Sequence, residues 1–310
     1  MTKTIIQKIS DSSQNEFYIK REDLFPFSFG GNKARKAIGF FEKIDAGDYD
    51  CVVTYGSSSS NHCRVVSNMA AARKMSCYII SPEEASEQTF NSKMMECFGA
   101  QISVVPVEKV SKTIDSKMEE LRNSGKKPYF IAGGGHGNIG THAYVECYNE
   151  IKEYECENNT FFDYIFHASG TGTTQAGLVC GMLMNNDNRK IIGISVARRN
   201  PRGRDVVLDS VKDYLSSVGF TISDDMIESA TIFNDQYILG GYGNSSENIK
   251  QTIDTCMTKY GIPLDETYTG KAFYGMLDYL DKNEIKDKRI LFIHTGGTPL
   301  FFDYLKRTAK

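Results

Sequence analysis

Short apolar runs alternate with amphipathic stretches along most of the 310-residue chain. The apolar runs are rich in β-branched and aromatic residues, and we expect strands at 51–56, 76–81, 101–107, 128–132, 164–169, 190–197, 230–235 and 290–296. The stretches between them repeat apolar residues about every 3.6 positions, which predicts helices within 63–74, 92–99, 113–125, 141–154 and 247–261. This alternation is typical of βαβ units, so the sequence predicts an α/β fold with twisted, mainly parallel sheets.

Four loops rich in glycine, serine and threonine follow predicted strands and precede helical segments. They comprise residues 55–62, 132–138, 168–174 and 294–299. In open α/β sheets, the loops at the carboxyl ends of the strands carry the ligand site. We therefore expect a small polar molecule to be held between these four loops.

Residues 169–174, with the sequence SGTGTT, combine hydroxyl groups and glycines ahead of a helix. Backbone N–H groups at such a helix start favour a phosphate. The loop lacks the lysine of a triphosphate-binding loop, and it lacks the GxGxxG pattern with a downstream acidic residue that binds dinucleotides. A glycine-rich turn with a helix cap has the same composition, so the motif alone leaves both readings open.

The loop SSSSNH, residues 57–62, lacks the GxSxG elbow that a serine hydrolase requires. Its serines are suited to a polar ligand and equally to capping the next helix. Thr295, at the end of the last predicted strand, has a hydroxyl that can contact a ring nitrogen or close a local turn. Both loops therefore contribute candidate ligand contacts rather than a nucleophile.

Lys33 follows Gly30, Gly31 and Asn32 at the predicted start of a helix. The positive end of a helix dipole disfavours a cation, so this lysine is either solvated or held neutral. A neutral amine is the form that makes a Schiff base with an aldehyde, and positive surroundings favour it. Together with the phosphate loop, this indicates a phosphorylated aldehyde bound to Lys33.

The composition and charge of the chain exclude further classes of partner. The net charge is −3 and the sequence pI is about 6.0, with no long basic run, so a nucleic acid or a membrane surface is not expected. No stretch reaches the roughly 18 apolar residues of a membrane span, and the N-terminus lacks the features of a signal peptide. The eight cysteines form no CxxC or Cys/His ligand pattern, which predicts reduced thiols in a cytoplasmic protein without a metal.

Six segments, in this order along the chain, carry a resemblance to a known family. They are KREDLFPFSFGGNKARK (20–36), SSNHCR (59–64), SGTGTT (169–174), GGYG (240–243), YTGKA (268–272) and LFIHTGG (291–297). The chain resembles the D-cysteine desulfhydrases and 1-aminocyclopropane-1-carboxylate deaminases, which are pyridoxal 5'-phosphate enzymes of fold type II related to the tryptophan synthase β-subunit. The similarity extends from about residue 15 to about residue 303.

The resemblance implies an architecture. A large cofactor-binding domain would comprise residues 1–44 and 146–310, and a small inserted domain would comprise residues 45–145. The active site would lie in the cleft between them. The resemblance also implies a small amino-acid substrate and a homodimer.

The resemblance further implies a role for each matching residue. Lys33 would attach the cofactor and move the substrate Cα proton, and Asn61 would bond the ring 3'-oxygen. Ser60, Asn61 and His62 would contact the substrate, with Ser60 also among the catalytic groups, and Tyr242 and Tyr268 match two active-site tyrosines. The other cofactor contacts would come from Ser169, Gly170, Thr171, Gly172, Thr173, Thr174, Thr269 and Thr295.

Two positions depart from the family pattern. Ser59 stands where glutamine is more common, and Thr269 stands where the deaminase has a glutamate that keeps the ring nitrogen protonated. A neutral hydroxyl suits β-elimination of a good leaving group, so the expected reaction is a lyase reaction that converts D-cysteine to pyruvate, ammonia and sulfide.

Other reactions stay open. They are deamination of 1-aminocyclopropane-1-carboxylate, β-replacement synthesis, and elimination from a sulfonate amino acid, which an arginine of segment 197–204 would select. A non-catalytic sensor of a small ligand is the alternative from another functional class.

Overall fold

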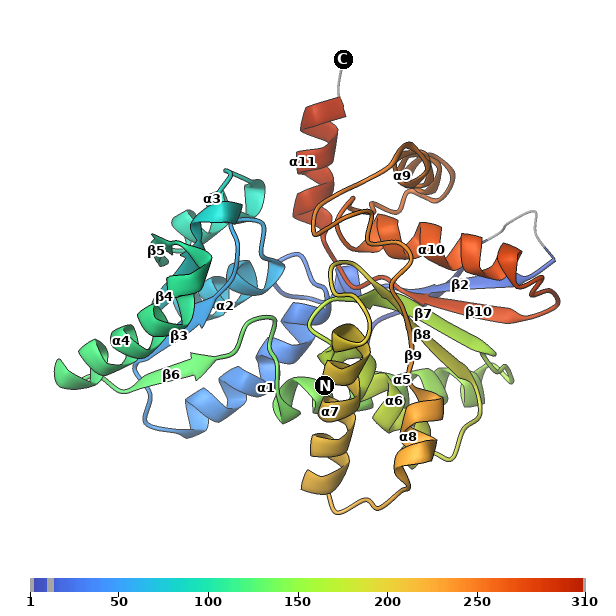
Figure 1. The fold of residues 1–310 in the computed structure, drawn as a ribbon, viewed down its shortest axis with the longest axis horizontal. Helices are drawn as coiled ribbons and strands as arrows, with labels where there is room; N and C mark the ends of the chain where they lie inside the picture. Colours follow the sequence, from blue (N-terminus) through green and yellow to red (C-terminus); the bar gives the residue numbers. More distant parts are fainter. Residues whose placement is uncertain (1–2, 10–13, 309–310) are drawn as a thin grey trace.

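The computed structural model describes residues 3–9 and 14–308, and in these residues two sheets form two lobes (Figure 1). The larger sheet has the strand order β1-β2-β10-β7-β8-β9 and is parallel except for the antiparallel pair β1-β2. The smaller sheet has the order β5-β4-β3-β6 and is parallel throughout. The predicted α/β class with mainly parallel sheets is confirmed.

All eight predicted strands are present. The larger sheet contains β1 (Ile6–Ile9), β2 (Glu16–Lys20), β7 (Tyr164–Ser169), β8 (Lys190–Ser195), β9 (Ile232–Asn234) and β10 (Arg289–Ile293). The smaller sheet contains β3 (Cys51–Tyr55), β4 (Ser76–Pro82), β5 (Gln101–Val105) and β6 (Pro128–Ile131). The prediction missed β1 and β2, because charged residues interrupt these two short segments.

The five predicted helices correspond to α2 (Asn61–Ala72), α3 (Phe90–Cys97), α4 (Val110–Asn123), α5 (Asn138–Glu157) and α9 (Glu247–Tyr260). The remaining α-helices are α1 (Asn32–Ala46), α6 (Thr173–Met184), α7 (Arg202–Ser217), α8 (Asp224–Ala230), α10 (Thr269–Lys282) and α11 (Thr298–Thr308). Helix α6 is buried on all sides from Thr173 to Leu183, so its sequence has no amphipathic period to detect.

Helices cover both faces of the larger sheet (Figure 1). One face packs against α5, α6, α7 and α8, and the other packs against α9, α10 and α11. Neighbouring residues of each strand divide between the two faces, as Phe166 and Ile165 of β7 do. Both faces are therefore apolar, which is why these strands appear as continuous hydrophobic runs.

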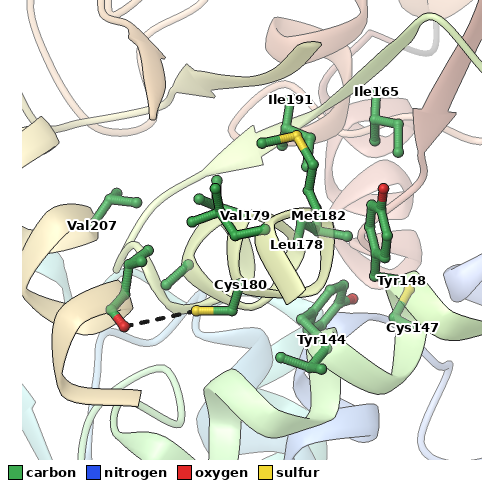
Figure 2. Packing of buried hydrophobic residues seen from close by; sticks show 14 of the residues in the cluster. Tyr144, Cys147, Tyr148, Ile165, Leu178, Val179, Cys180, Met182, Ile191 and Val207 are labelled. Carbon is green, nitrogen blue, oxygen red and sulfur yellow. Dashed lines mark hydrogen bonds between the residues drawn. The ribbon is translucent and has the colours of Figure 1, made fainter. Parts of the chain in front are cut away.

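Figure 2 shows the core on the first face, where Leu178 and Val179 of α6 lie between the sheet and α5. Gly181 allows α6 to approach α5 closely, because a Cβ on this glycine would lie 2.5 Å from the Cβ of Tyr148. The tight contact fixes the position of α6 relative to α5.

The smaller sheet packs against α1, α2 and α3 on one face and against α4 on the other. Phe40, Phe41 and Ile44 of α1 belong to the core of this smaller sheet. Helix α1 thus contacts the smaller lobe, although the predicted boundary at residue 44 assigns it to the large domain. The division into residues 1–44 with 146–310 and an inserted 45–145 stays a prediction.

A buried ionic network joins β2, α1 and α5. Arg35 of α1 donates to Glu22 at 2.6 Å and to Glu150 of α5 at 2.7 Å, and Lys20 of β2 donates to Glu150 at 2.7 Å. Burial alone would raise the pKa of Glu22, but Arg35 and Lys20 hold it below its ordinary value. The charged part of segment 20–36 therefore anchors the helix whose first turn carries Lys33.

Candidate active site

A cavity of about 290 Å³ lies at the carboxyl ends of strands from both sheets. Three of the four glycine-rich loops contribute to its wall, namely those after β3, β6 and β7. Among the described residues, its wall consists of Lys33, Tyr55, Gly56, Ser57, Ser60, Asn61, His62, Gly133, Gly134, Gly170, Thr171, Val196, Ala197, Arg198, Tyr242 and Tyr268.

The turn before α1 requires a glycine at position 31. Gly31 has a φ of 93°, and a Cβ there would lie 2.8 Å from the Thr295 carbonyl oxygen. The same carbonyl accepts a hydrogen bond of 3.0 Å from the Asn32 backbone N–H. The turn into α1 therefore lies directly against the end of β10, which only glycine permits.

Lys33 extends from the first turn of α1 into the cavity. Its Nζ donates to the Gly134 carbonyl at 3.1 Å. Burial and, to a smaller extent, the charge of Arg198 lower the pKa of Lys33 to about 8. A substantial share of this amine is therefore neutral near pH 8, as a nucleophilic lysine requires.

The loop after β3 carries two polar residues, Ser60 and Asn61, whose hydrogen-bonding groups are only partly used within the protein. Ser60 caps α2, because its Oγ accepts from the Cys63 backbone N–H at 3.1 Å. The Asn61 Oδ1 accepts from Arg64 at 2.6 Å and from Asn91 at 3.0 Å. These contacts leave the Ser60 hydroxyl hydrogen and the Asn61 amide hydrogens as donors for a ligand.

His62 lines the cavity, but its donor is already used. The Thr54 hydroxyl donates to the Ile131 carbonyl at 2.7 Å, so at its 2.9 Å contact with His62 it must accept from Nε2–H. Burial, together with Lys33 and Lys36, lowers the pKa of His62 to about 3. The ring is neutral and its remaining nitrogen is an acceptor, so His62 offers no hydrogen-bond donor to a ligand, and its contact with the substrate stays a prediction.

Two tyrosines meet on the opposite wall. The hydroxyls of Tyr242 and Tyr268 lie 2.5 Å apart, and the Ser59 hydroxyl lies 3.4 Å from that of Tyr242. Burial and the neighbouring Tyr242 raise the pKa of Tyr268 well above its ordinary value. Tyr268 therefore keeps its proton and presents a neutral hydroxyl group beside that of Tyr242.

The predicted phosphate loop forms the turn from β7 into α6. Gly170 and Thr171 line the cavity. Gly172 has a φ of 92° at the N-cap of α6, and a Cβ there would lie 3.3 Å from side chains of Val206 and Val207. The loop thus directs the N-terminus of a buried helix towards the cavity, an arrangement suited to an anion.

The other hydroxyls of this loop have partners inside the protein. Ser169 donates to Gln175 at 3.1 Å, Thr173 contacts His136 at 3.1 Å, and Thr174 accepts from Asn32 at 3.0 Å. These residues are not part of the cavity wall. Their side chains connect the loop to its surroundings.

Two further predicted contacts are also absent from the wall. The Thr269 hydroxyl is fully buried and donates to the Asp265 carboxylate at 2.8 Å. Thr295 is 7% exposed, and its carbonyl holds the start of α1. The structure therefore does not direct the Thr269 hydroxyl at the cavity, because Asp265 at the start of α10 attracts it.

The prediction missed Lys36 beside the site, and it anticipated Arg198 only as one of the arginines of segment 197–204. Lys36, one helical turn after Lys33, is buried, and its Nζ has no hydrogen-bond partner among the described residues. Arg198 lines the cavity, and its Nη1 donates to the Thr171 carbonyl at 3.2 Å. The spacing of Lys33 and Lys36 was a usable signal, since residues three apart share a helix face.

The cavity wall is cationic. Among the described residues that line it, Lys33 and Arg198 are basic and none is an aspartate or glutamate. A cavity of one charge sign with low-dielectric walls concentrates ligands of the opposite sign. An anionic small molecule is therefore the ligand class that suits this site.

Over the part of the chain that is described, no group of three or more His, Cys, Asp or Glu side chains is placed to hold a metal ion. The described helices include none that is long and apolar enough to cross a membrane.

Known proteins resemble this chain over almost its full length. A family model described as "Pyridoxal-phosphate dependent enzyme" matches residues 3–296. A D-cysteine desulfhydrase of Yersinia pestis is 32% identical, with 96% of this chain and 92% of the relative covered. A protein of Pyrococcus horikoshii, provisionally named 1-aminocyclopropane-1-carboxylate deaminase, is 34% identical over 96% of this chain and 90% of its own length.

Solved structures agree with the fold. The crystal structure of an ACC deaminase homologue superimposes with a TM-score of 0.88 at 31% identity, covering 99% of this chain and 93% of the other. A cysteine synthase of Entamoeba histolytica shares the fold at 15% identity, with a TM-score of 0.68 and coverage of 99% and 88%.

Proposed function

Because the chain belongs to the family of pyridoxal-phosphate-dependent enzymes, in the group of D-cysteine desulfhydrases and 1-aminocyclopropane-1-carboxylate deaminases, we propose that it is a β-elimination lyase for a small amino acid. The preferred substrate in this proposal is D-cysteine, and the products are pyruvate, ammonia and sulfide. The observation that carries the proposal is Lys33, a lysine of lowered pKa that faces a cationic cavity.

The residues present fit the cofactor. Lys36 is a buried lysine whose Nζ has no hydrogen-bond partner among the described residues; burial and the charge of Lys33 lower its pKa, and it lies behind the glycine loop 133–135. An uncompensated buried cation is costly unless an anion accompanies it. The N-terminus of α6 also favours an anion. A phosphate between Lys36 and the loop 170–174 satisfies both groups.

Bound pyridoxal phosphate supplies an aldehyde for amines and a ring that accepts electrons from the substrate Cα. In the proposal Lys33 attaches the cofactor and takes the Cα proton as its neutral amine. Asn61 donates its amide hydrogens to the cofactor or the substrate, and Ser60 donates to the substrate carboxylate. Tyr242 and Tyr268, whose hydroxyls line the same cavity, would donate a hydrogen bond or a proton to the leaving group.

The charge of the wall supports the choice of reaction. Among the described residues no carboxylate lines the cavity, so no acidic side chain of the wall stabilises positive charge on a bound ring. The reaction then depends more strongly on the leaving group. A thiolate leaves with its electron pair far more readily than a strained carbon–carbon bond breaks, which favours D-cysteine over the cyclopropane.

A side-by-side assay tests this proposal. The purified protein with pyridoxal phosphate is given D-cysteine, L-cysteine and 1-aminocyclopropane-1-carboxylate, and pyruvate, ammonia and sulfide are measured. We expect the highest kcat/KM for D-cysteine. Faster deamination of the cyclopropane would reverse the ranking, use of L-cysteine alone would remove the D-specificity, and turnover of none of the three would favour the sensor or a synthase.

Arg198 supports a second candidate substrate, an amino acid with an anionic β-substituent such as cysteate. Its guanidinium lines the cavity, and burial together with Arg202 lowers its pKa. A partly buried guanidinium binds a sulfonate or carboxylate through charge-assisted hydrogen bonds. In this reaction Lys33 removes the Cα proton, the C–S bond breaks, sulfite leaves with the electron pair, and water hydrolyses the released enamine to pyruvate and ammonia.

A substitution of Arg198 distinguishes the two candidate substrates. Replacing one charged hydrogen-bond donor costs about 10- to 100-fold, so Arg198→Met lowers kcat/KM for cysteate on this scale if Arg198 binds the sulfonate. The value for D-cysteine should change far less, and Lys250→Ala, at an exposed lysine, serves as a control. Equal losses for both substrates would contradict a role of Arg198 in selecting an anionic substituent.

We also propose that the protein acts in the cytoplasm as a homodimer. Support for the compartment comes from the eight cysteines, which are all free and mostly buried. Fractionation, and light scattering of the purified protein, test these two points.

A further inference from the structure

Lys271 is a buried lysine that does not face the cavity. It lies in the first turn of α10 and is fully buried. Its Nζ donates to the backbone carbonyls of Val196 at 3.3 Å, Ile238 at 3.3 Å and Gly241 at 3.5 Å. Three carbonyl acceptors match the three hydrogens of an ammonium group, so the group is enclosed by backbone oxygens.

An ammonium is costly at this position. The N-terminal turn of a helix opposes positive charge, and burial lowers the pKa of Lys271 to about 8 although Asp265 opposes the effect. A neutral side chain of similar length would avoid these costs. The three hydrogen bonds that the ammonium donates to backbone carbonyls offset these costs.

The three carbonyls belong to segments that form the cavity wall. Val196 is itself in the wall, at the end of β8, and Gly241 immediately precedes Tyr242. Lys271 follows Tyr268, which is the N-cap of α10, by three residues. One ammonium thus connects the end of β8, the loop with Tyr242 and the helix start with Tyr268.

The loop with Tyr242 has few other supports. The Tyr242 side chain is 42% exposed, so its own burial does not fix it. Leu239, Gly240 and Gly243 have φ values of 55°, 87° and 81°, and this curled backbone turns the carbonyls of residues 238 and 241 towards Lys271. Besides the contact of Tyr242 with Tyr268, these backbone contacts hold the loop in place.

We propose that Lys271 is a positioning residue, whose ammonium acts as a built-in monovalent cation that holds the Tyr242 loop against the end of β8 and beside Tyr268. Removing the side chain leaves a site of three backbone carbonyls that a free K⁺ or NH₄⁺ ion can enter. The protein with Lys271 requires no such ion. The variant Lys271→Ala becomes dependent on one.

The first experiment uses the unmodified holoenzyme. Its turnover is measured in KCl and in tetramethylammonium chloride at equal ionic strength, since tetramethylammonium is too large for the site and donates no hydrogen bond. We expect the same kcat/KM in both salts within about a factor of two. A requirement for K⁺ in the unmodified enzyme would overturn the proposal, whether or not any variant folds.

The second experiment uses Lys271→Ala, with Lys250→Ala as the control at an exposed lysine of α9. In tetramethylammonium chloride, kcat/KM of Lys271→Ala should fall about 10- to 100-fold, the scale of one lost charged hydrogen bond. K⁺ or NH₄⁺ should recover most of this loss, and the control should respond to neither salt. A folded Lys271→Ala variant that no cation rescues, or that loses nothing, contradicts the proposal.

The proposal rests on the proposed function only through these turnover measurements, so a third readout is independent of any substrate. Hydrogen exchange of the amides in residues 237–244 is followed in Lys271→Ala in the two salts. Exchange should be faster in tetramethylammonium and slow again in K⁺, with no difference in the α6 core. Equal exchange in both salts overturns the inference even if the substrate is correctly identified, and a wrong substrate leaves this readout intact.

Discussion

Lys33 and Lys271 occupy equivalent local positions and have opposite surroundings. Each lies in the first turn of a helix, and burial lowers the pKa of each to about 8. The Lys33 Nζ has one carbonyl contact and faces a cavity, whereas the Lys271 Nζ has three carbonyl contacts and no exposure. A lowered lysine pKa therefore does not identify a reactive amine, and the space in front of the nitrogen does.

The charges that neighbour the two lysines have opposite effects on the lysine pKa. Arg198 adds to the effect of burial at Lys33, which favours the neutral amine, whereas Asp265 opposes burial at Lys271, which favours the ammonium. The pKa of each lysine nevertheless comes to about 8, so the open space in front of Lys33 and the three carbonyls around Lys271 distinguish the two groups. The following experiments test the roles of these two lysines and of the loops around them, beginning with the largest expected effect.

Removing the reactive amine should abolish turnover. Lys33→Ala loses both covalent attachment of the cofactor and the group that moves the Cα proton, and we expect a loss of at least about 1,000-fold. Borohydride treatment of the unmodified holoenzyme followed by peptide mass spectrometry should find the cofactor on Lys33. Labelling of Lys271 would reverse the assignment of the two lysines.

The next largest loss of activity is expected on substitution of Tyr268. Tyr268→Phe removes the hydroxyl that lies 2.5 Å from the Tyr242 hydroxyl, and we expect kcat to fall about 100-fold or more because a positioned proton donor is missing. Cofactor absorbance should be unchanged, since Lys33 is intact. Loss of cofactor together with activity would mean that Tyr268 mainly supports the fold.

Substitution in the phosphate loop should affect binding of the cofactor rather than the reaction. Gly172→Leu places a side chain where φ is 92° and where its Cβ would lie 3.3 Å from Val206 and Val207. We expect the cofactor Kd to rise about tenfold, the cost of roughly 1–2 kcal/mol of backbone strain. Dialysis with absorbance readings measures it, and saturating cofactor should restore kcat; failure of that rescue would contradict the phosphate assignment.

The smallest effect is on pH dependence. The neutral form of Lys33 forms above its pKa, so attachment of pyridoxal phosphate to the apoenzyme should speed up as the pH rises through about 8. Arg198→Met removes a positive charge that lowers this pKa, so the midpoint should move to higher pH. Stopped-flow absorbance follows the reaction, and a midpoint that moves to lower pH in Arg198→Met would exclude this electrostatic coupling.

Local sequence was sufficient for the fold class and for most of the loops around the cavity. Alternating periodicity predicted the ten-strand α/β arrangement apart from β1 and β2, whose charged residues broke the pattern. Glycines before Lys33 and in 170–174 marked turns whose positive φ and close approach the structure displays at Gly31 and Gly172. Backbone preferences of this kind act within a few residues, so a sequence contains them.

The direction of individual side chains could not be predicted in this way. Thr269 was expected at the cofactor, yet its hydroxyl donates to Asp265, and His62 lies in the cavity wall, yet its ring N–H donates to Thr54. In both residues a nearby buried acceptor competes for the donor, and its position depends on the packing of the whole lobe. The composition of a motif says which groups are present and not which partner each group selects.

The sequence by itself determined that this chain forms parallel sheets with glycine-rich loops at one edge and a lysine at a helix start. Only the tertiary structure decided which lysine faces an open cavity and which is enclosed. The carbonyls around Lys271 are separated from it by 75, 33 and 30 residues along the chain. Burial and hydrogen-bond partners set the charge and reactivity of a lysine, and those partners meet only when distant segments pack together.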